Sequence, residues 1–462
     1  MQQSPFRIRG VIEGFYGPYY TFPERNDLIR FIGKHGFNLY IYGPKNDRQH
    51  RARWQQLYPP EVMDQFAETV HIAAQAGVDF CYAIAPLAYD HLKDFDSLTK
   101  KLQSFYDRGV RSFSVLVDDI MCATHGNPFC KVCPRPADPH VEVCNRLYEW
   151  LTSMDPACAL NMCPSEYHGE GPFSDYVHDL GERLHAEIDI LYTGPEVCSP
   201  AISSADARGY GDAVRRSPLI WDNYPVNDLA MRPYMHIGPI RKRDAKLYEA
   251  VRGVVVNPMI QAEASKIPLL TFADYFRDPH GYDPWRSWER ALLAVGGKQT
   301  YNALLQFAEN SLDSPLGTIE PSKLKRLTTA AIVALKTSEQ LQDNAALTAL
   351  REHLETLDEA CYELKFRSAN LRLRDNLLPW VEALDEWVWI GKRSFVVLDA
   401  MASGNRLELA AWNLKRAVEE IKDQAKKVGG SALLPLAQRV LELAADRKPQ
   451  PVALHSATAS AA

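Results

Sequence analysis

Residues 111–117 read RSFSVLV, a short and mostly apolar run, and two carboxylates, Asp118 and Asp119, follow it directly. A run of this length that ends in polar residues is typical of a buried β-strand. Seven similar runs occur between residues 7 and 256, with starts about 30 to 50 residues apart. They are Arg7–Phe15, Phe37–Tyr42, Val78–Ile84, Ala157–Met162, Ile188–Tyr192, Pro218–Trp221 and Gly253–Val256.

The segments between these runs have the apolar periodicity of amphipathic helices. In residues 61–76, for example, Val62, Phe66 and Val70 fall on one stripe and charged residues lie opposite. Eight strands with helices between them predict an α/β fold, a closed (β/α)8 or TIM barrel. An open, doubly wound sheet is the alternative, but no G-x-G-x-x-G motif opens any of these units.

After Trp285 the strand signal ends and the pattern becomes helical. The predicted helices are Lys323–Asp343, Ala345–Arg374, Leu377–Met401, Arg406–Lys427 and Ala432–Asp446. Their short joins predict an antiparallel, all-α helical bundle. We expect a barrel over residues 1–285, the bundle over 286–446 and a disordered tail over 447–462. The bundle tryptophans, Trp380, Trp387, Trp389 and Trp412, are expected mainly in its core, with one of Trp387 and Trp389 as a candidate interface residue.

The composition limits the classes of function. The 52 Lys and Arg against 58 Asp and Glu leave a net charge of −6, so nucleic acid is not an expected partner. No apolar run approaches the ~18 residues of a membrane span, and the first residues contain no signal-peptide core. Nine cysteines, an odd number, fit a reducing compartment, and we expect a cytoplasmic protein. No cofactor is expected, and no catalytic metal, because the strand ends carry no H-x-H pair.

Polar residues follow the ends of almost all the predicted strands. In a (β/α)8 barrel these ends meet at one rim, where active sites are built. Glu13, Asp47 and Asp222 belong to this set. So do Gly14, Lys45, Asp118, Asp119, Tyr167, Thr193, Asn223, Asp228 and Asn257, with Trp221 at the end of the seventh run.

The Asp118–Asp119 pair is the most informative of these features. Two carboxylates held close together repel, so one can stay protonated while the other stays ionised, as cleavage of a glycosidic bond requires. Retaining glycosidases normally place two carboxylates ~5 Å apart on opposite faces of the bond. Because sequence neighbours approach from one side, this pair suits a substrate that supplies its own nucleophile, such as the acetamido carbonyl of an N-acetylhexosamine. A helix cap, a surface ion pair or a metal site are the alternatives.

Seven blocks of the sequence resemble glycoside hydrolase family 84, the O-GlcNAcases and related β-N-acetylglucosaminidases. They are GVIEGFYG at 10–17, YGPKND at 42–47, VLVDDI at 115–120, CPSEY at 163–167, YTGPEV at 192–197, WDNYPVND at 221–228 and VVVNP at 254–258. The blocks occur in the family's order and cover the whole predicted barrel. The family's fold, a (β/α)8 barrel followed by a helical domain, agrees with the prediction made from the strand and helix pattern.

The resemblance implies a role for each matching residue. Asp118 would orient the acetamido group, and Asp119 would act as general acid and then base. The residues that would bind the sugar hydroxyls are Gly14, Lys45, Asp228 and Asn257. The residues that would contact the acetamido group are Tyr167, Thr193 and Trp221, with Cys163 beside them. Asn223 would hydrogen-bond near that group or to the neighbouring hydroxyl.

The expected activity is that of a retaining exo-β-N-acetylglucosaminidase acting through an oxazoline, on GlcNAc-bearing proteins or glycans. A catalytically silent GlcNAc-binding or regulatory protein, and a hexosaminidase acting on a polysaccharide, are the alternatives. A homodimer through the helical domain is a further expectation. The loop after Asp119 contains Cys122, His125, Cys130 and Cys133. These residues either bind a structural zinc ion, or the three cysteines are reduced free thiols.

Overall fold

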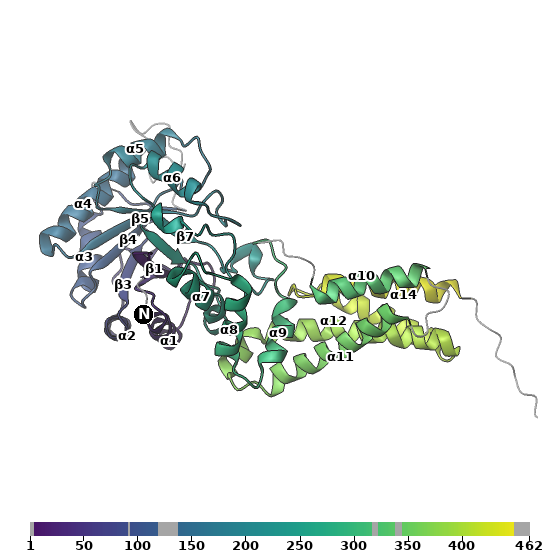
Figure 1. The fold of residues 1–462 in the computed structure, drawn as a ribbon. Helices are drawn as coiled ribbons and strands as arrows, with labels where there is room; N and C mark the ends of the chain where they lie inside the picture. The colour runs from purple at the N-terminus through teal and green to yellow at the C-terminus, as the bar shows by residue number, and fades with distance from the viewer. Residues whose placement is uncertain (1–3, 91–92, 119–136, 317–321, 338–343, 448–462) are drawn as a thin grey trace, which may run out of the picture. The chain divides into compact units, whose positions relative to one another are not determined.

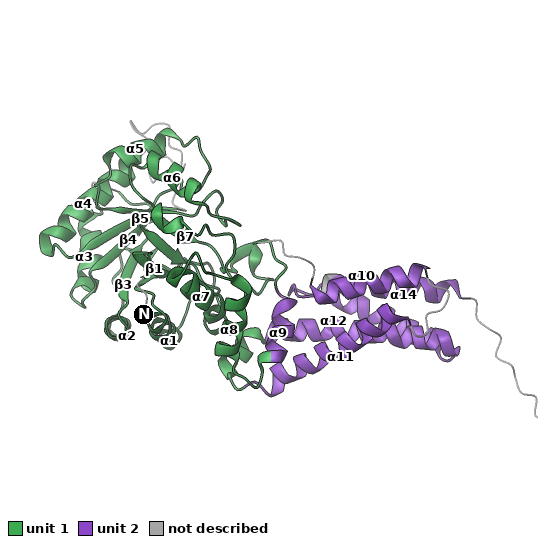
Figure 2. Ribbon diagram, in the orientation of Figure 1, with its two compact units in different colours: residues 1–301, 312–318, 369–377 green, residues 302–311, 319–368, 378–462 purple. Residues whose placement is uncertain are grey.

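The computed structural model describes residues 4–90, 93–118, 137–316, 322–337 and 344–447. The chain forms two compact units, shown in green and purple in Figure 2. Unit 1 comprises residues 1–301, 312–318 and 369–377, and unit 2 comprises residues 302–311, 319–368 and 378–462. Helix α8, Pro284–Gly296, spans the position of the boundary predicted at residue 285 and belongs to unit 1.

Unit 1 is a closed barrel of eight parallel strands in sequential order, so the predicted α/β (β/α)8 fold is confirmed. The strands lie at the centre of this unit with helices around them (Figure 1). All eight predicted runs contain a strand: β1 Ile8–Glu13, β2 Leu39–Tyr42, β3 Asp79–Ile84, β4 Ser112–Leu116, β5 Ala159–Cys163, β6 Asp189–Tyr192, β7 Leu219–Asp222 and β8 Gly253–Val256. The barrel closes where β1 pairs with β8.

Four of the helices that cover the barrel, α1, α5, α6 and α8, begin with a side chain that caps the first turn. Thr21 starts α1 with a capping box to Glu24, and Ser203 starts α6 in the same way with Asp206. Pro60 occupies the first turn of α2, where its missing N–H costs nothing. These helices are α1 Phe22–Lys34, α2 Pro60–Gln75, α3 Phe95–Tyr106, α4 Asp138–Met154, α5 Asp175–Arg183, α6 Ser204–Ala213, α7 Ala262–Arg277 and α8 Pro284–Gly296, with short 3-10 turns η1 Leu229–Met231 and η2 Leu247–Glu249.

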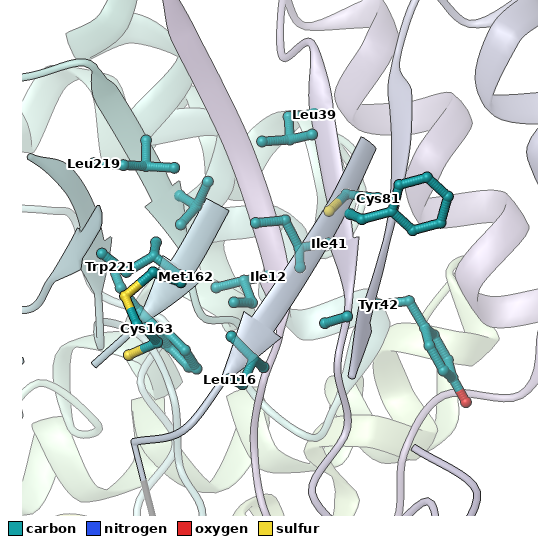
Figure 3. Close-up of a cluster of buried hydrophobic side chains, with 14 of the residues drawn as sticks. Ile12, Leu39, Ile41, Tyr42, Cys81, Leu116, Met162, Cys163, Leu219 and Trp221 are labelled. Carbon is teal, nitrogen blue, oxygen red and sulfur yellow. The ribbon is translucent and has the colours of Figure 1, made fainter. Parts of the chain in front are cut away.

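Apolar side chains of the strands fill the centre of unit 1. Figure 3 shows a cluster that includes Ile12 of β1, Ile41 of β2, Leu116 of β4 and Met162 of β5, all of them fully buried. The cluster reaches Trp221 at the end of β7. A packed interior of this kind makes the barrel a rigid support for the loops at its rim.

The second unit is built from helices, as expected. They are α9 Tyr301–Glu309, α10 Lys323–Thr337, α11 Ala345–Phe366, α12 Leu371–Ser403, α13 Leu407–Ile421 and α14 Gly430–Asp446. The first residues of α9 and of α12 belong to unit 1. Within unit 2, α10 packs against α11 and α14. No helix of the described residues has the length and apolar character that a membrane span needs.

Two details of the bundle differ from the sequence prediction. The helix predicted over 345–374 ends at Phe366, because Asn370 caps a new helix by accepting a hydrogen bond from the N–H of Leu373. Trp380 and Trp387 are buried as predicted, but Trp389 and Trp412 are about half exposed, at 48% and 56%. Each exposed ring lies beside a guanidinium group, that of Arg393 or that of Arg416.

Candidate active site

A cavity of about 380 Å³ opens at the carboxyl ends of the strands. Nine of the ten predicted site residues line it: Gly14, Lys45, Asp118, Tyr167, Thr193, Trp221, Asn223, Asp228 and Asn257. The tenth, Asp119, lies outside the described residues, as do Cys122, His125, Cys130 and Cys133. The volume is at the lower end of the range of small-molecule sites, about 300 to 1,000 Å³.

The residues converge because the strands are parallel and in register. Glu13 pairs with Tyr42 across β1 and β2, and Asp222 pairs with Val256 across β7 and β8. Each of these residues ends its strand, so the loops that follow start at the same level of the barrel. Segments more than 240 residues apart in the chain therefore contribute to one cavity.

The ammonium group of Lys45 forms an ion pair with Oδ2 of Asp118. The side chains are almost wholly buried, with 3% and 8% of their surface exposed. The other carboxylate oxygen of Asp118, Oδ1, is buried and has no hydrogen-bond partner among the described residues. A buried acceptor without a donor costs about 1 to 3 kcal/mol, so this oxygen is suited to a ligand that brings an N–H or O–H group.

Asp228 is held by the backbone of the loop that follows β1. Its Oδ2 accepts a hydrogen bond of 2.7 Å from the N–H of Tyr16. Burial raises the pKa of the Asp228 carboxyl, and this N–H and the charges of Arg232 and Lys45 oppose the rise. The carboxylate keeps further acceptor capacity for a hydroxyl group in the cavity.

The indole ring of Trp221 forms a wall of the cavity and explains why residue 14 is a glycine. A Cβ atom added at Gly14 would lie 2.5 Å from Cζ2 of Trp221, closer than any real contact. A side chain at position 14 is thus excluded by the tryptophan. The Lys45 ammonium lies 5.6 Å from the centre of the same ring, within the range of a cation–π contact.

Thr193 and Tyr167 come from neighbouring loops and are joined through the backbone. The N–H of Thr193 donates to the carbonyl of Tyr167 at 2.8 Å, and the Thr193 hydroxyl lies 2.8 Å from the carbonyl of Glu196. Cys163, at the end of β5, is buried and also lines the cavity, in agreement with the position that the family resemblance implies.

Three rim carboxylates of the sequence prediction do not line the cavity. Glu13 and Asp222 form buried ion pairs with Arg25 and Arg243, and Asp47 accepts hydrogen bonds of 2.6 Å from the hydroxyls of Tyr42 and Tyr58. These side chains stabilise the fold beside the cavity instead. Glu13 and Asp222 each end a strand, in which successive side chains point to opposite sides. Asp47 lies in the loop after β2, where the two tyrosine hydroxyls hold it.

Sequence reasoning missed a set of lining residues that are mostly apolar: Tyr16, Val197, Cys198, Val226, Leu229, Ala230 and Met231. Tyr16 and Val197 stand inside the matching blocks, so their positions gave a signal. Leu229 and Met231 gave none, because an apolar residue in a loop looks like any core residue. Among the described residues no group of three His, Cys, Asp or Glu side chains could hold a metal ion.

Comparisons with known proteins match the barrel sequence and the fold. The model of the β-N-acetylglucosaminidase family matches residues 9–309. The protein O-GlcNAcases of Rattus norvegicus and Mus musculus are each 32% identical over 279 residues, or 58% of this chain and 30% of theirs. The chain thus spans less than a third of the length of these relatives.

Solved structures match over a larger share of the chain. A variant of an O-GlcNAc hydrolase from Thermobaculum terrenum has a TM-score of 0.86 and 29% identity, with 95% of both chains covered. CpGH84B has a TM-score of 0.82 and 27% identity, with 95% of this chain and 77% of that one covered. Because the family model matches well over half of the sequence, this chain belongs to the β-N-acetylglucosaminidases of glycoside hydrolase family 84.

Proposed function

We propose that this protein is a retaining exo-β-N-acetylglucosaminidase that removes O-linked N-acetylglucosamine from proteins. The catalytic residues in this proposal are Asp118 and Asp119, and the reaction uses the acetamido group of the substrate as the nucleophile. The names of the relatives, protein O-GlcNAcase and O-GlcNAc hydrolase, support the choice of substrate. Polysaccharide and other glycan ends present the same terminal sugar, and a hexosaminidase acting on a polysaccharide is the alternative for the substrate.

The first step forms one bond and breaks another at the anomeric carbon. The acetamido carbonyl oxygen attacks this carbon while Asp118 accepts the acetamido N–H as a hydrogen bond. The bond to the aglycone breaks, its electron pair stays on the aglycone oxygen, and that oxygen takes the proton of Asp119. The product is an oxazoline whose developing positive charge is stabilised by the Asp118 carboxylate.

The second step reverses the geometry of the first. Asp119, now ionised, takes a proton from water, and the water oxygen attacks the anomeric carbon on the face that the aglycone left. The oxazoline opens and the acetamido group is restored. Two displacements at the same carbon give net hydrolysis with retention of configuration.

The observation that carries the proposal is the buried Oδ1 atom of Asp118. Its neighbour Oδ2 forms an ion pair with the ammonium of Lys45, which fixes the orientation of the carboxylate. Oδ1 has no donor among the described residues and belongs to a side chain that lines the cavity. An acetamido N–H is a donor of the required kind, and the indole wall of Trp221 suits the methyl group and ring beside it.

The decisive experiment uses aryl N-acetyl-β-glucosaminides. Progressive fluorination of the N-acetyl group makes its carbonyl oxygen less nucleophilic, so kcat/KM should fall steeply with each fluorine. Asp119→Asn should lose activity mainly on substrates with poor leaving groups, since a good leaving group needs no acid. Asp118→Asn should lose activity on both kinds. A flat response to fluorination would exclude the substrate as nucleophile, and turnover of none of these substrates would favour the silent GlcNAc-binding protein.

Three expectations from the sequence stay predictions beside this proposal. They are a cytoplasmic location, a homodimer formed through the helical domain, and the division of the chain at residues 285 and 446.

A further inference from the structure

Four residues at the seam of the barrel, where the first strand meets the last, form a closed circuit of contacts. The Gly14 N–H donates to Oδ1 of Asn257 at 3.3 Å, besides its shorter bond to the carbonyl of Ile12. Nδ2 of Asn257 donates to Oδ1 of Asn223 at 2.8 Å. The indole Nε1 of Trp221 donates to the same oxygen at 2.8 Å, and the Trp221 ring packs on Gly14.

The direction of every bond in this circuit is set by the indole. An indole N–H can only donate, so the atom of Asn223 that faces it must be the carbonyl oxygen. That oxygen can receive a second hydrogen bond only from a donor, so Asn257 must turn its NH2 group toward it. The carbonyl oxygen of Asn257 then faces the Gly14 N–H, as observed.

Three hydrogen bonds within the protein hold Asn223 in place. Both lone pairs of its Oδ1 are used, and one of the two N–H bonds of its Nδ2 donates to the carbonyl of Val197 at 2.7 Å. Asn257 likewise uses one of its two N–H bonds, on Asn223, and it lines the cavity with its amide orientation fixed.

We propose that Asn223 is a positioning residue, and that the Trp221 indole acts through it to make Asn257 a hydrogen-bond donor toward a sugar hydroxyl oxygen. This inference deepens the proposed function and rests on it. It differs from the role that family resemblance implies for Asn223, which is direct contact with the substrate. It also gives the indole of Trp221 a second role besides that of a cavity wall.

The two roles of Asn223 separate in a conservative variant. Asn223→Asp keeps an acceptor for both Trp221 and Asn257 but has no N–H to give to a ligand. Asn223→Ala removes both acceptors. If Asn223 positions, Asn223→Ala should lower kcat/KM by roughly tenfold to a hundredfold, and Asn223→Asp should recover most of the loss. If Asn223 instead donates to the sugar, the two variants should be equally impaired, and the inference is wrong.

A double-mutant cycle tests the link to the indole. Trp221→Phe keeps an aromatic wall but removes the donor that sets the circuit. The losses of Trp221→Phe and Asn223→Ala should be strongly non-additive, because both variants release the same amide of Asn257. Additive losses would show that the two residues act independently and would overturn the inference. Tyr224→Phe is the matched control: it removes one hydrogen bond, to the carbonyl of Gly238, from the same loop and should leave activity unchanged.

Binding of N-acetylglucosamine by calorimetry distinguishes this inference from the proposed function. A wild-type protein that binds the sugar without turning over aryl substrates would contradict the proposed function alone. The same ranking should then appear in the dissociation constants, with Asn223→Ala weakest and Asn223→Asp near wild type. If binding is equally weak in both variants, the positioning role fails whatever the activity of the wild-type protein.

Discussion

Two buried carboxylates at the rim of the barrel, Glu13 and Asp118, have opposite surroundings. The Glu13 oxygens accept hydrogen bonds from the backbone of Tyr20, from Nε and Nη2 of Arg25 and from the hydroxyl of Tyr40. Asp118 has the ammonium of Lys45 on one oxygen, and its other oxygen has no partner among the described residues. Glu13 is the last residue of β1, and Asp118 lies just after the end of β4. Only Asp118 lines the cavity.

The difference separates carboxylates that hold the site from those suited to react in it. A carboxylate whose acceptor positions are filled by protein donors has nothing to offer a ligand, and it stabilises the fold. Asp222, paired through both oxygens with Arg243, resembles Glu13 in this respect. A buried oxygen without a donor is retained at a cost in stability, and a ligand that supplies the donor removes the cost.

The largest expected effect is the loss of activity in Asp118→Asn. Removal of the charge that orients the acetamido group and stabilises the oxazoline should lower kcat/KM by about a thousandfold, or ~4 kcal/mol. The free energy of unfolding should fall as well, by about 3 kcal/mol, because the buried ammonium of Lys45 loses its counter-charge. Kinetics on an aryl glucosaminide and denaturant unfolding measure the two quantities; near-normal activity would remove Asp118 from catalysis.

Glu13→Gln should lower stability but largely spare activity. This substitution leaves the buried guanidinium of Arg25 without its counter-charge, which should lower the free energy of unfolding by about 3 kcal/mol. The activity of the folded fraction should fall far less than in Asp118→Asn, since Glu13 does not line the cavity. Asp399→Asn, which breaks an exposed ion pair with Arg351, is the control and should cost under ~1 kcal/mol. Equal losses of activity in Glu13→Gln and Asp118→Asn would contradict the distinction between the two carboxylates.

The remaining effect appears only below pH 6.5 and concerns two buried histidines, His50 and His236. Burial lowers the pKa of each ring to about 4, from an ordinary value of 6.5. Between these values the unfolded chain binds more protons than the folded one. The stability is therefore fully present above pH 6.5 and falls as the pH drops toward 4, by up to about 1.4 kcal/mol per pH unit for each ring.

Thermal unfolding at several pH values measures this dependence. Nδ1 of His50 lies 2.8 Å from the carbonyl of Ala83, and an asparagine can make the same bond without titrating in this range. The His50→Asn variant should therefore have a smaller slope between pH 6.5 and 4 than the wild-type protein. An unchanged slope would mean that His50 does not titrate differently in the folded and unfolded chains.

The strand pattern and the residues at the strand ends could be predicted because their signals are local. Each buried parallel strand is a short apolar run, and all such strands end at one rim, so the position of a residue just after a run predicts where it lies. For the same reason Lys45, Asp118 and Asn257 could be assigned to one site from sequence alone.

Which side chains face the cavity was decided only by the tertiary structure. Glu13 and Gly14 are neighbours in the sequence, but one is turned toward Arg25 and the other toward Trp221. The Asn223–Asn257 hydrogen bond joins residues 34 positions apart, and no local pattern encodes it. Leu229 lines the cavity through a loop that has no periodicity. Local sequence thus determined the strands and the rim, whereas the contacts that distinguish a supporting carboxylate from a reactive one depend on long-range packing.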